Sequence, residues 1–182
     1  MGQFARESGE MVPVTFLLCQ PNEVVQVKDS EKENVSGVVL GSTPLKKPRK
    51  TKKFKVLKQF ALPESAMKKG EKVSLESFQD CKTFTIVGTS KGKGFQGGVK
   101  RHNFRTARHT HGTKEGRHGS TGAATAPGRT KPGLKMPGHM GCDRITLKKR
   151  QVVNIDPKNH VVAIKGPVAG AIGSTVFLLK ED

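Results

Sequence analysis

The feature that most limits the fold of this chain is the segment at residues 89–141, which has neither helical nor strand periodicity. It contains twelve Gly and three Pro, and its few large apolar residues are scattered along it. A segment of this kind buries too little apolar surface to offset the conformational entropy that is lost on ordering. Long structureless loops in compact domains are normally either functional or disordered. We therefore expect a segment whose order depends on a partner.

Strand-like sequence flanks this segment on both sides, which predicts an insertion into a β-domain rather than a terminal tail. Short apolar and β-branched runs separated by turn residues are typical of an antiparallel barrel or sandwich. The clearest turn begins at Asp156, because Pro157 presets φ and the Asp156 and Asn159 side chains can bond the local backbone. Residues 64–69 are compatible with one helical turn. The predicted strands are 12–18, 24–27, 35–40, 73–75 and 83–87 before the insertion, and 144–147, 151–155, 161–165 and 175–179 after it.

The net charge of the chain is concentrated in two segments. Its 33 Lys and Arg against 15 Asp and Glu give +18, a charge that repels itself in a compact state unless a polyanion neutralises it. Residues 44–58 hold eight basic residues and no acid, and residues 89–141 hold eleven against Glu115 alone. The remaining residues balance at fourteen of each sign. This pattern predicts a neutral body with two cationic arms that bind nucleic-acid phosphate.

The predicted organisation is therefore a first part of a β-body at residues 1–88 with a basic arm at 44–58, an RNA-binding insertion at 89–141, and closing strands at 142–182. Lys and Arg neutralise phosphate, and His can stack on bases or donate to phosphate and ribose. Glycine lets backbone N–H groups approach phosphate closely. The candidate RNA-binding side chains are Lys46, Lys47, Arg49, Lys50, Lys52, Lys53, Lys91, Lys93, Lys100, Arg101, His102, Arg105, Arg108, His109, His111, Lys114, Arg117, His118, Arg129, Lys131, Lys135 and His139. The candidate glycines are Gly92, Gly94, Gly97, Gly98, Gly119, Gly122, Gly128 and Gly138.

A second interpretation of the insertion is a dinucleotide site, because Gly92, Gly94 and Gly97 match the pattern G-x-G-x-x-G and Glu115 follows about twenty residues later. That site needs a packed helix and then a second parallel strand within about 30 residues. Residues 99–104 could form a helical turn or two, but no strand is predicted before residue 144. The sequence therefore favours phosphate binding without a nicotinamide cofactor.

Metal and catalytic sites are also weakly supported. The histidines of the insertion, and His139 with Cys142, lack the paired spacing of a zinc site, so no metal or cofactor is expected. Ser120 near His118 has no triad context, and acids are almost absent from the insertion, so no enzymatic activity and no small-molecule substrate are expected.

The cysteines and the apolar runs bear on the compartment. Cys19, Cys81 and Cys142 are far apart and odd in number, as expected for small buried side chains in a reducing compartment. The N-terminus resembles neither a secretory signal nor a transit peptide, and no apolar run approaches the roughly 20 residues of a membrane helix.

Three stretches of the sequence resemble one known family. They are SKGKGFQGGVKRHNF at residues 90–104, HGTKEGRHGSTGAATAPGRTKPGLKMPGHMG at 111–141 and KNHVVAIKGPVAGAIGSTVFL at 158–178. The opening MGQF, followed by VPVT, is also similar. The chain is therefore identified as a member of the universal large-subunit ribosomal protein family "L three", in its bacterial or organellar branch.

This resemblance implies a mainly β fold, with a small six-stranded barrel body and a long irregular, basic, Gly-rich insertion that reaches toward the peptidyl-transferase centre. It also implies binding to large-subunit ribosomal RNA near its 3′ end, early assembly, neighbouring ribosomal proteins as partners, and a bacterial-type cytoplasmic ribosome. An organellar ribosome remains an alternative location. The alternative function is a basic RNA-binding module or RNA chaperone outside the ribosome, which the same composition permits.

The sequence departs from this family in three places. The first strand is expected to be shortened at the start of the chain, and the arm at 46–58 is shorter and more basic than in bacterial members. A glutamine that some bacterial members methylate is replaced by the segment at 122–126, so that modification is expected to be absent. The insertion tip is expected at residues 117–129.

Overall fold

The computed structural model of the 182-residue chain describes residues 1–6, 8–28, 37–50, 52–61, 67–106, 108, 110, 112, 119–122, 125–126 and 128–180. The chain divides into two compact units. Unit 1 comprises Met1–Ile86, Leu147–Val168 and Leu178–Asp182. Unit 2 comprises Val87–Thr146 and Ala169–Phe177.

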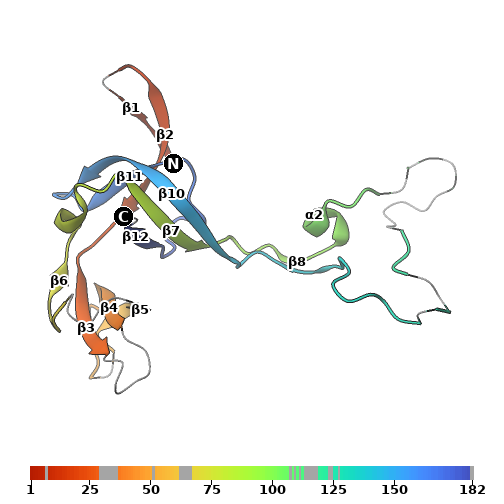
Figure 1. Cartoon of the computed structure of the whole chain (residues 1–182), viewed down its shortest axis with the longest axis horizontal. Coiled ribbons are helices and arrows are strands. Elements are labelled where there is room, and N and C mark those ends of the chain that lie inside the picture. Colours follow the sequence, from red (N-terminus) through yellow and green to blue (C-terminus); the bar gives the residue numbers. More distant parts are fainter. Residues whose placement is uncertain are drawn as a thin grey trace. The chain divides into compact units, whose positions relative to one another are not determined.

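A six-stranded sheet contains the first and the last strands of the chain. β2 pairs with β1 and β11, and β11 pairs with β10, all antiparallel. β1 and β12 occupy the two ends of the strand order, so the sheet is open (Figure 1). The mainly β class is confirmed, and "barrel" describes this open sheet only loosely. In sheet order the strands are β1 (Gly2–Ala5), β2 (Met11–Leu18), β11 (Val161–Lys165), β10 (Arg144–Asp156), β7 (Thr83–Thr89) and β12 (Phe177–Lys180).

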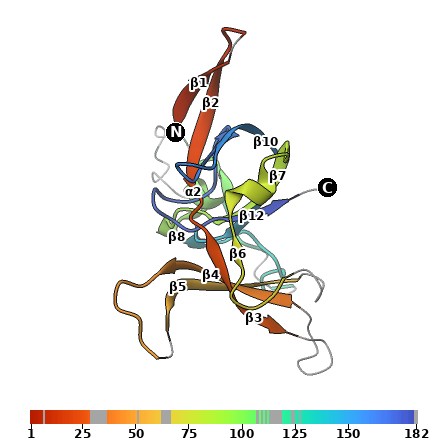
Figure 2. The same cartoon turned by 90° about the vertical axis from the view of Figure 1, so that its left-hand side faces the viewer.

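A four-stranded sheet is built mainly from strands that follow one another in the chain (Figure 2). Its order is β5 (Phe54–Phe60), β4 (Gly37–Pro44), β3 (Asn22–Lys28) and β6 (Lys72–Val73). β6 is shorter than the predicted strand at 73–75, because Leu75 begins the 3-10 helix η2 (Leu75–Phe78). The predicted helical turn at 64–69 and the start of the predicted strand at 35–40 lie mostly or partly outside the described residues.

The core side chains come from alternating positions of the strands. In β2, Val12 and Val14 are buried, while Met11 and Pro13 between and beside them are exposed. Because successive side chains of a strand point to opposite faces, this pattern places one face of β2 against the core. The largest fully buried side chains are Phe84, Ile86, Ile164, Val12, Val14, Val24, Val38 and Val162, and all of them lie outside residues 89–141.

The predicted turn between β10 and β11 is confirmed. The Asp156 carboxylate accepts hydrogen bonds from the backbone N–H groups of Lys158 and Asn159 at 3.1 and 3.2 Å, and from the Asn159 side-chain amide at 2.6 Å. These hydrogen bonds, that of the Asn159 side chain first, hold the pKa of Asp156 below its ordinary value. The turn is therefore fixed by one carboxylate.

The described part of the insertion contains three regular elements, of which only the helix was expected. Its elements are β8 (Gly94–Gln96), α2 (Gly98–His102) and β9 (Gly138–Met140). α2 matches the expected helical turn at 99–104, whereas both strands are new. Among the described residues, no helix has the length and apolar character needed to cross a bilayer.

Candidate nucleic-acid interface

The outgoing and returning segments of the insertion pair with each other at its base, both in β8 and β9 and in the residues next to these strands. The Ser90 N–H donates to the Asp143 carbonyl at 2.9 Å, the Asp143 N–H donates to the Ser90 hydroxyl at 3.1 Å, and the Lys93 N–H donates to the Met140 carbonyl at 2.9 Å. The antiparallel pairing then continues to Gln96 opposite Gly138. We call residues 90–96 with 138–143 the root ribbon; its chains run side by side up to α2 (Figure 1).

Glycines allow the two chains of the root ribbon to approach each other. A Cβ added at Gly141, which has a φ of +82°, would lie 2.9 Å from the Gly92 Cα and 3.0 Å from the Lys93 nitrogen. A Cβ added at Gly92 would lie 2.9 Å from the sulfur of Cys142. Real Cβ atoms do not approach other atoms this closely, so Gly141, which faces backbone atoms at a positive φ, requires glycine. At Gly92 a side chain would have to displace the Cys142 sulfur. The expected approach of the Gly92 backbone to RNA stays a prediction.

The residues that follow the short helix α2 fold back and pack against it. Asn103 ends the helix in the left-handed conformation at φ 56°, and the Phe104 N–H then donates to the Gly98 carbonyl at 3.4 Å. The Phe104 ring covers Gly98, where an added Cβ would lie 2.8 Å from the ring. The rings of His102 and Phe104 are 5.8 Å apart between centroids. This packing orients the side chains on the last turn of α2.

Two of those side chains converge on the returning chain of the insertion. The Arg101 guanidinium donates to the Met136 carbonyl at 2.7 Å, and Nε2 of His102 lies 3.1 Å from the same oxygen. A carbonyl only accepts, so the His102 Nε2 carries the hydrogen. A Cβ at Gly138 would lie 2.7 Å from the Arg101 Nη1, so glycine leaves room for the guanidinium. We call Arg101, His102, Met136 and Gly138 the clasp.

The other basic side chains of the insertion that the structure describes face solvent. No acidic side chain pairs with them in the part of the insertion that the structure describes, and Glu115 lies outside it. Their like charges therefore remain uncompensated by the protein, which raises local affinity for phosphate. The predicted side chains that the structure places as exposed are Lys91, Lys93, Lys100, Arg105, Arg108, Arg129, Lys131, Lys135 and His139.

The basic arm at 44–58 is a hairpin built on β4 and β5. Beyond the last strand pair, Pro44 opposite Phe54, the Leu45 N–H donates to the Lys53 carbonyl at 2.9 Å. Arg49 and Lys52 then exchange two backbone hydrogen bonds of 3.0 and 3.2 Å. The predicted residues Lys46, Lys47, Arg49, Lys50, Lys52 and Lys53 are all exposed on this hairpin. The sequence missed β5 because Lys55 and Lys58 were assigned to an irregular charged run.

The predicted glycines fall into two groups. Gly92, Gly98 and Gly138 contact other parts of the insertion, as described above. At Gly94, Gly97, Gly119 and Gly122 an added Cβ would meet nothing within 4 Å, and at Gly128 it would meet only the Thr125 carbonyl at 3.8 Å. The second group therefore leaves backbone open to a partner. The predicted residues His109, His111, Lys114, Arg117 and His118 lie outside the described residues.

The alternative sites are not assembled in the described part of the chain. β8 pairs antiparallel with β9, so the glycine motif does not belong to a parallel strand–helix–strand unit. Within the described ranges, no three His, Cys, Asp or Glu side chains gather around a common point suited to a metal ion. Of the cysteines, Cys142 is exposed, and burial raises the pKa of the Cys19 thiol to about 11.

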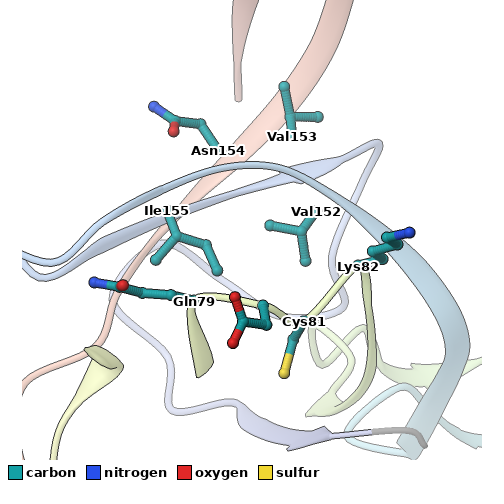
Figure 3. Close-up of a pocket in the computed structure, with 8 residues that line it drawn as sticks. Gln79, Cys81, Lys82, Val152, Val153, Asn154 and Ile155 are labelled. Atoms are coloured by element: carbon teal, nitrogen blue, oxygen red, sulfur yellow. The ribbon is translucent and has the colours of Figure 1, made fainter. Parts of the chain in front are cut away.

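Unit 1 also contains an open hollow of about 750 Å³ (Figure 3). The pairing of β10 with β11 shifts register between Val152 and Asn154, which is a β-bulge. In Figure 3, Val152 and Ile155 point to the side on which Cys81 lies, whereas Val153 and Asn154 point away from it. The lining of the hollow contains one carboxylate and no histidine, so it offers no acid–base pair for catalysis. The lining residues are Gln79, Asp80, Cys81, Lys82, Val152, Val153, Asn154 and Ile155.

One exposed aromatic residue of the root ribbon was not among the predicted residues. Phe95 lies in the middle of β8 directly opposite His139 of β9, and its side chain is 76% exposed. The available signal was an aromatic residue between glycines in a basic segment, which indicates a ring that its neighbours cannot cover. The charge pattern drew attention to Lys and Arg instead.

Known proteins match almost the whole chain. A sequence model of the family described as ribosomal protein L3 matches residues 45–170. Large ribosomal subunit protein uL3 of Treponema denticola is 40% identical over 190 residues, covering 98% of this chain and 91% of that protein. The proteins of the same name from Borrelia garinii subsp. bavariensis and Borrelia hermsii are 36% and 37% identical, covering 100% and 99% of this chain and 94% and 92% of those proteins. The resemblance of the glycine-rich segments is thus confirmed, and the chain belongs to the ribosomal protein L3 family.

Proposed function

We propose that this protein is a structural constituent of the large ribosomal subunit that binds large-subunit ribosomal RNA through its insertion and its basic hairpin. The observation that carries the proposal is the exposed, acid-free cationic surface of the described insertion, held on a paired root ribbon. Membership of the L3 family supports it. Contacts to phosphate dominate over base readout. The protein catalyses no reaction, takes no cofactor, and acts in the cytoplasm with RNA and neighbouring ribosomal proteins as partners.

The finer part of the proposal concerns position. The protein binds near the 3′ end of the RNA, joins early in assembly, and directs its insertion toward the peptidyl-transferase centre. The family resemblance of residues 90–104 and 111–141 supports this location. The insertion contributes support to that centre without supplying a reacting group.

Co-sedimentation tests the function directly. Large subunits washed in high salt are pelleted and probed for the protein, with free protein in the absence of ribosomes as the control. We expect stoichiometric protein in the washed large-subunit pellet. Release of the protein by the wash, with retained binding to free RNA, would favour the alternative of an RNA chaperone outside the ribosome.

Substitutions at the tip of the insertion test whether it reaches toward the peptidyl-transferase centre. Small residues let a backbone pass between crowded RNA strands, and an added Cβ at Gly122 meets nothing in the protein within 4 Å. We expect Gly122→Trp or Arg129→Glu to change the rate of peptidyl transfer, or sensitivity to drugs of that centre, in subunits that still contain the protein. Lys91→Glu in the root ribbon should instead weaken incorporation. Normal elongation and drug response in tip variants would contradict the proposed direction.

A further inference from the structure

We propose that Phe95 and His139 form a stacking platform for an unpaired RNA base at the root of the insertion. This inference rests on the proposed RNA binding and adds a specific base contact to it. Phe95 is 76% exposed, and His139 lies directly opposite it in the β8–β9 register. Directly opposite residues of an antiparallel pair project from the same face with Cβ atoms about 4.5–5.5 Å apart. The two rings therefore share one side of the root ribbon.

The described residues leave most of the Phe95 side chain uncovered, at 76% exposure. The residue lies between Gly94 and Gln96, and Gly97 follows; an added Cβ at Gly94 or Gly97 would meet no atom within 4 Å. A single exposed apolar side chain is common on protein surfaces and needs no explanation by itself. Phe95 differs because it is exposed directly opposite a second exposed ring, that of His139, on the paired root ribbon.

The charge around the platform selects a nucleic acid as its occupant. Lys91, Lys93 and Lys100 are exposed nearby in the chain, and Asp143 is the one acidic residue of the root ribbon. Lysine is depleted at the centres of protein interfaces, whereas proteins that bind single strands combine cationic side chains with exposed aromatic rings. The π-face of a base lies on the ring while the adjoining phosphates meet the lysines. Bases within a duplex are already stacked, so the ligand is an unpaired base.

The platform is held in place by the free protein. Backbone hydrogen bonds from Lys93 to Met140 and from Ser90 to Asp143, each 2.9 Å, fix the ribbon below it, and the clasp fixes the ribbon above it. A preformed site loses less conformational freedom on binding than one that must be ordered. The base contact is therefore built into the protein and does not depend on the order of the distal insertion.

The absence of Trp and Tyr from this chain allows a direct optical test. The variant Phe95→Trp places a single fluorophore on the platform of the full-length protein, and a stacked base quenches indole fluorescence. The matched control is Phe16→Trp, because Phe16 is also exposed, at 53%, and lies in unit 1 outside both arms. With poly(U) as the probe, we expect quenching for Phe95→Trp and none for Phe16→Trp. An RNA duplex should leave both variants unquenched.

Affinity supplies the second measurement. Stacking of a base on an aromatic ring contributes to the affinity for single strands, so we expect Phe95→Leu to bind poly(U) about tenfold more weakly. Phe95→Trp should bind about as tightly as the wild-type protein. Neither change removes a charge, so the slope of log affinity against log salt concentration should stay the same. Equal affinity of Phe95→Leu and the original protein, or equal quenching of Phe95→Trp by duplex and single strand, would overturn the platform.

The experiments distinguish a failure of the stacking platform from a failure of the proposed function. If the original protein binds ribosomal RNA and sediments with large subunits while Phe95→Trp shows no quenching, the platform is wrong and the ribosomal function stands. If the original protein binds no RNA in any assay, the proposed function itself is wrong.

Discussion

At the scale of single residues, the insertion uses glycine for two different purposes. Gly92, Gly98 and Gly141 let parts of the insertion approach one another, because a Cβ there would come within 3 Å of another atom. Gly97 and Gly119 have open space around them. Substitution at the first kind changes the protein's own structure, and substitution at the second kind changes only what a partner meets. The amino-acid composition does not distinguish the two kinds of glycine.

The clasp can be tested with Gly138→Ala, a variant that leaves the charge of the protein unchanged. In Gly138→Ala the new methyl group displaces the Arg101 guanidinium from the Met136 carbonyl. We expect about three- to tenfold faster hydrogen exchange at the Lys93 amide of the free protein, because one charge-assisted hydrogen bond is lost. RNA affinity should fall at an unchanged salt slope. The control for the exchange measurement in the free protein is Gly97→Ala, where the Cβ meets nothing and φ is −71°.

Arg101→Gln completes this test. If Arg101 acts through the clasp, its effect and that of Gly138→Ala should not add in the double variant, because both remove the same contact. If Arg101 contacts phosphate instead, Arg101→Gln alone should make the salt slope shallower by about 0.7–0.9. The second outcome would contradict the clasp.

The Asp156 turn predicts a dependence of stability on pH. The folded-state pKa of Asp156 is lowered, so its carboxylate stabilises the fold above the ordinary Asp pKa of about 4. That stabilisation is lost as the pH falls through the lowered value. Asp156→Asn retains an oxygen acceptor but no charge, so we expect it to melt at a lower temperature than the original protein at pH 7. The difference should vanish toward pH 2; a constant difference across this range would show that the charge is not responsible.

At the scale of elements, strands with an apolar pattern of their own were predictable from the sequence. Strands that exist only because another strand pairs with them were not. β11 was predicted at its observed bounds, Val161–Lys165, because its apolar run is continuous and bounded by turns. β10 was predicted as two runs; Lys149 has a φ of 51°, so the strand is irregular where the prediction broke it. β8 and β9 have three residues each, too few for a periodic signal, and are defined by their mutual pairing.

The interface was predictable to the same extent. Lys and Arg at residues 44–58 and 89–141 identified both cationic arms, because charge is a property of composition. The clasp was not predictable, since Arg101 and Met136 are 35 positions apart and neither residue type implies the other. The ring of Phe95 was overlooked because an exposed aromatic residue looks like a core residue in sequence.

The root ribbon predicts where the insertion can be removed. Gln96 and Gly138 lie directly opposite each other, so a two-residue Asn-Gly turn can join them after deletion of residues 97–137. The deletion removes nine basic residues and Glu115, and none of the largest fully buried side chains. We expect β-type circular dichroism and cooperative melting to persist. Loss of both would mean that the insertion is part of the core.

At the scale of the whole molecule, charge and apolar burial are segregated along the chain. The fully buried side chains lie outside residues 89–141, while 19 of the 33 basic residues lie in the two arms. Burial stabilises the body, and uncompensated positive charge in the arms opposes compaction until an anion is bound. Stability and the proposed RNA binding therefore belong to different parts of one chain.

This segregation predicts a steep salt dependence of RNA binding. Each neutralised phosphate contributes about −0.7 to −0.9 to the slope of log affinity against log salt concentration. We expect the full-length protein to give a steep slope with ribosomal RNA, and the deletion of residues 97–137 to give a shallower one that reflects the remaining basic hairpin. Binding with a slope near zero would contradict an interface based on phosphate contacts.

The pairing of β2 with β11 has a consequence for how the newly made chain folds. The Thr15 hydroxyl donates to the Gly166 carbonyl at 2.7 Å across 151 positions of sequence, whereas β3, β4 and β5 pair with near neighbours in the chain. Local pairings form early, and closure across a long loop is slow. During synthesis the four-stranded sheet can therefore form while β2 still lacks its partner, and both cationic arms leave the translating ribosome before the larger sheet is complete. The proposed RNA-binding arms are therefore synthesised before the larger sheet of the body can be completed.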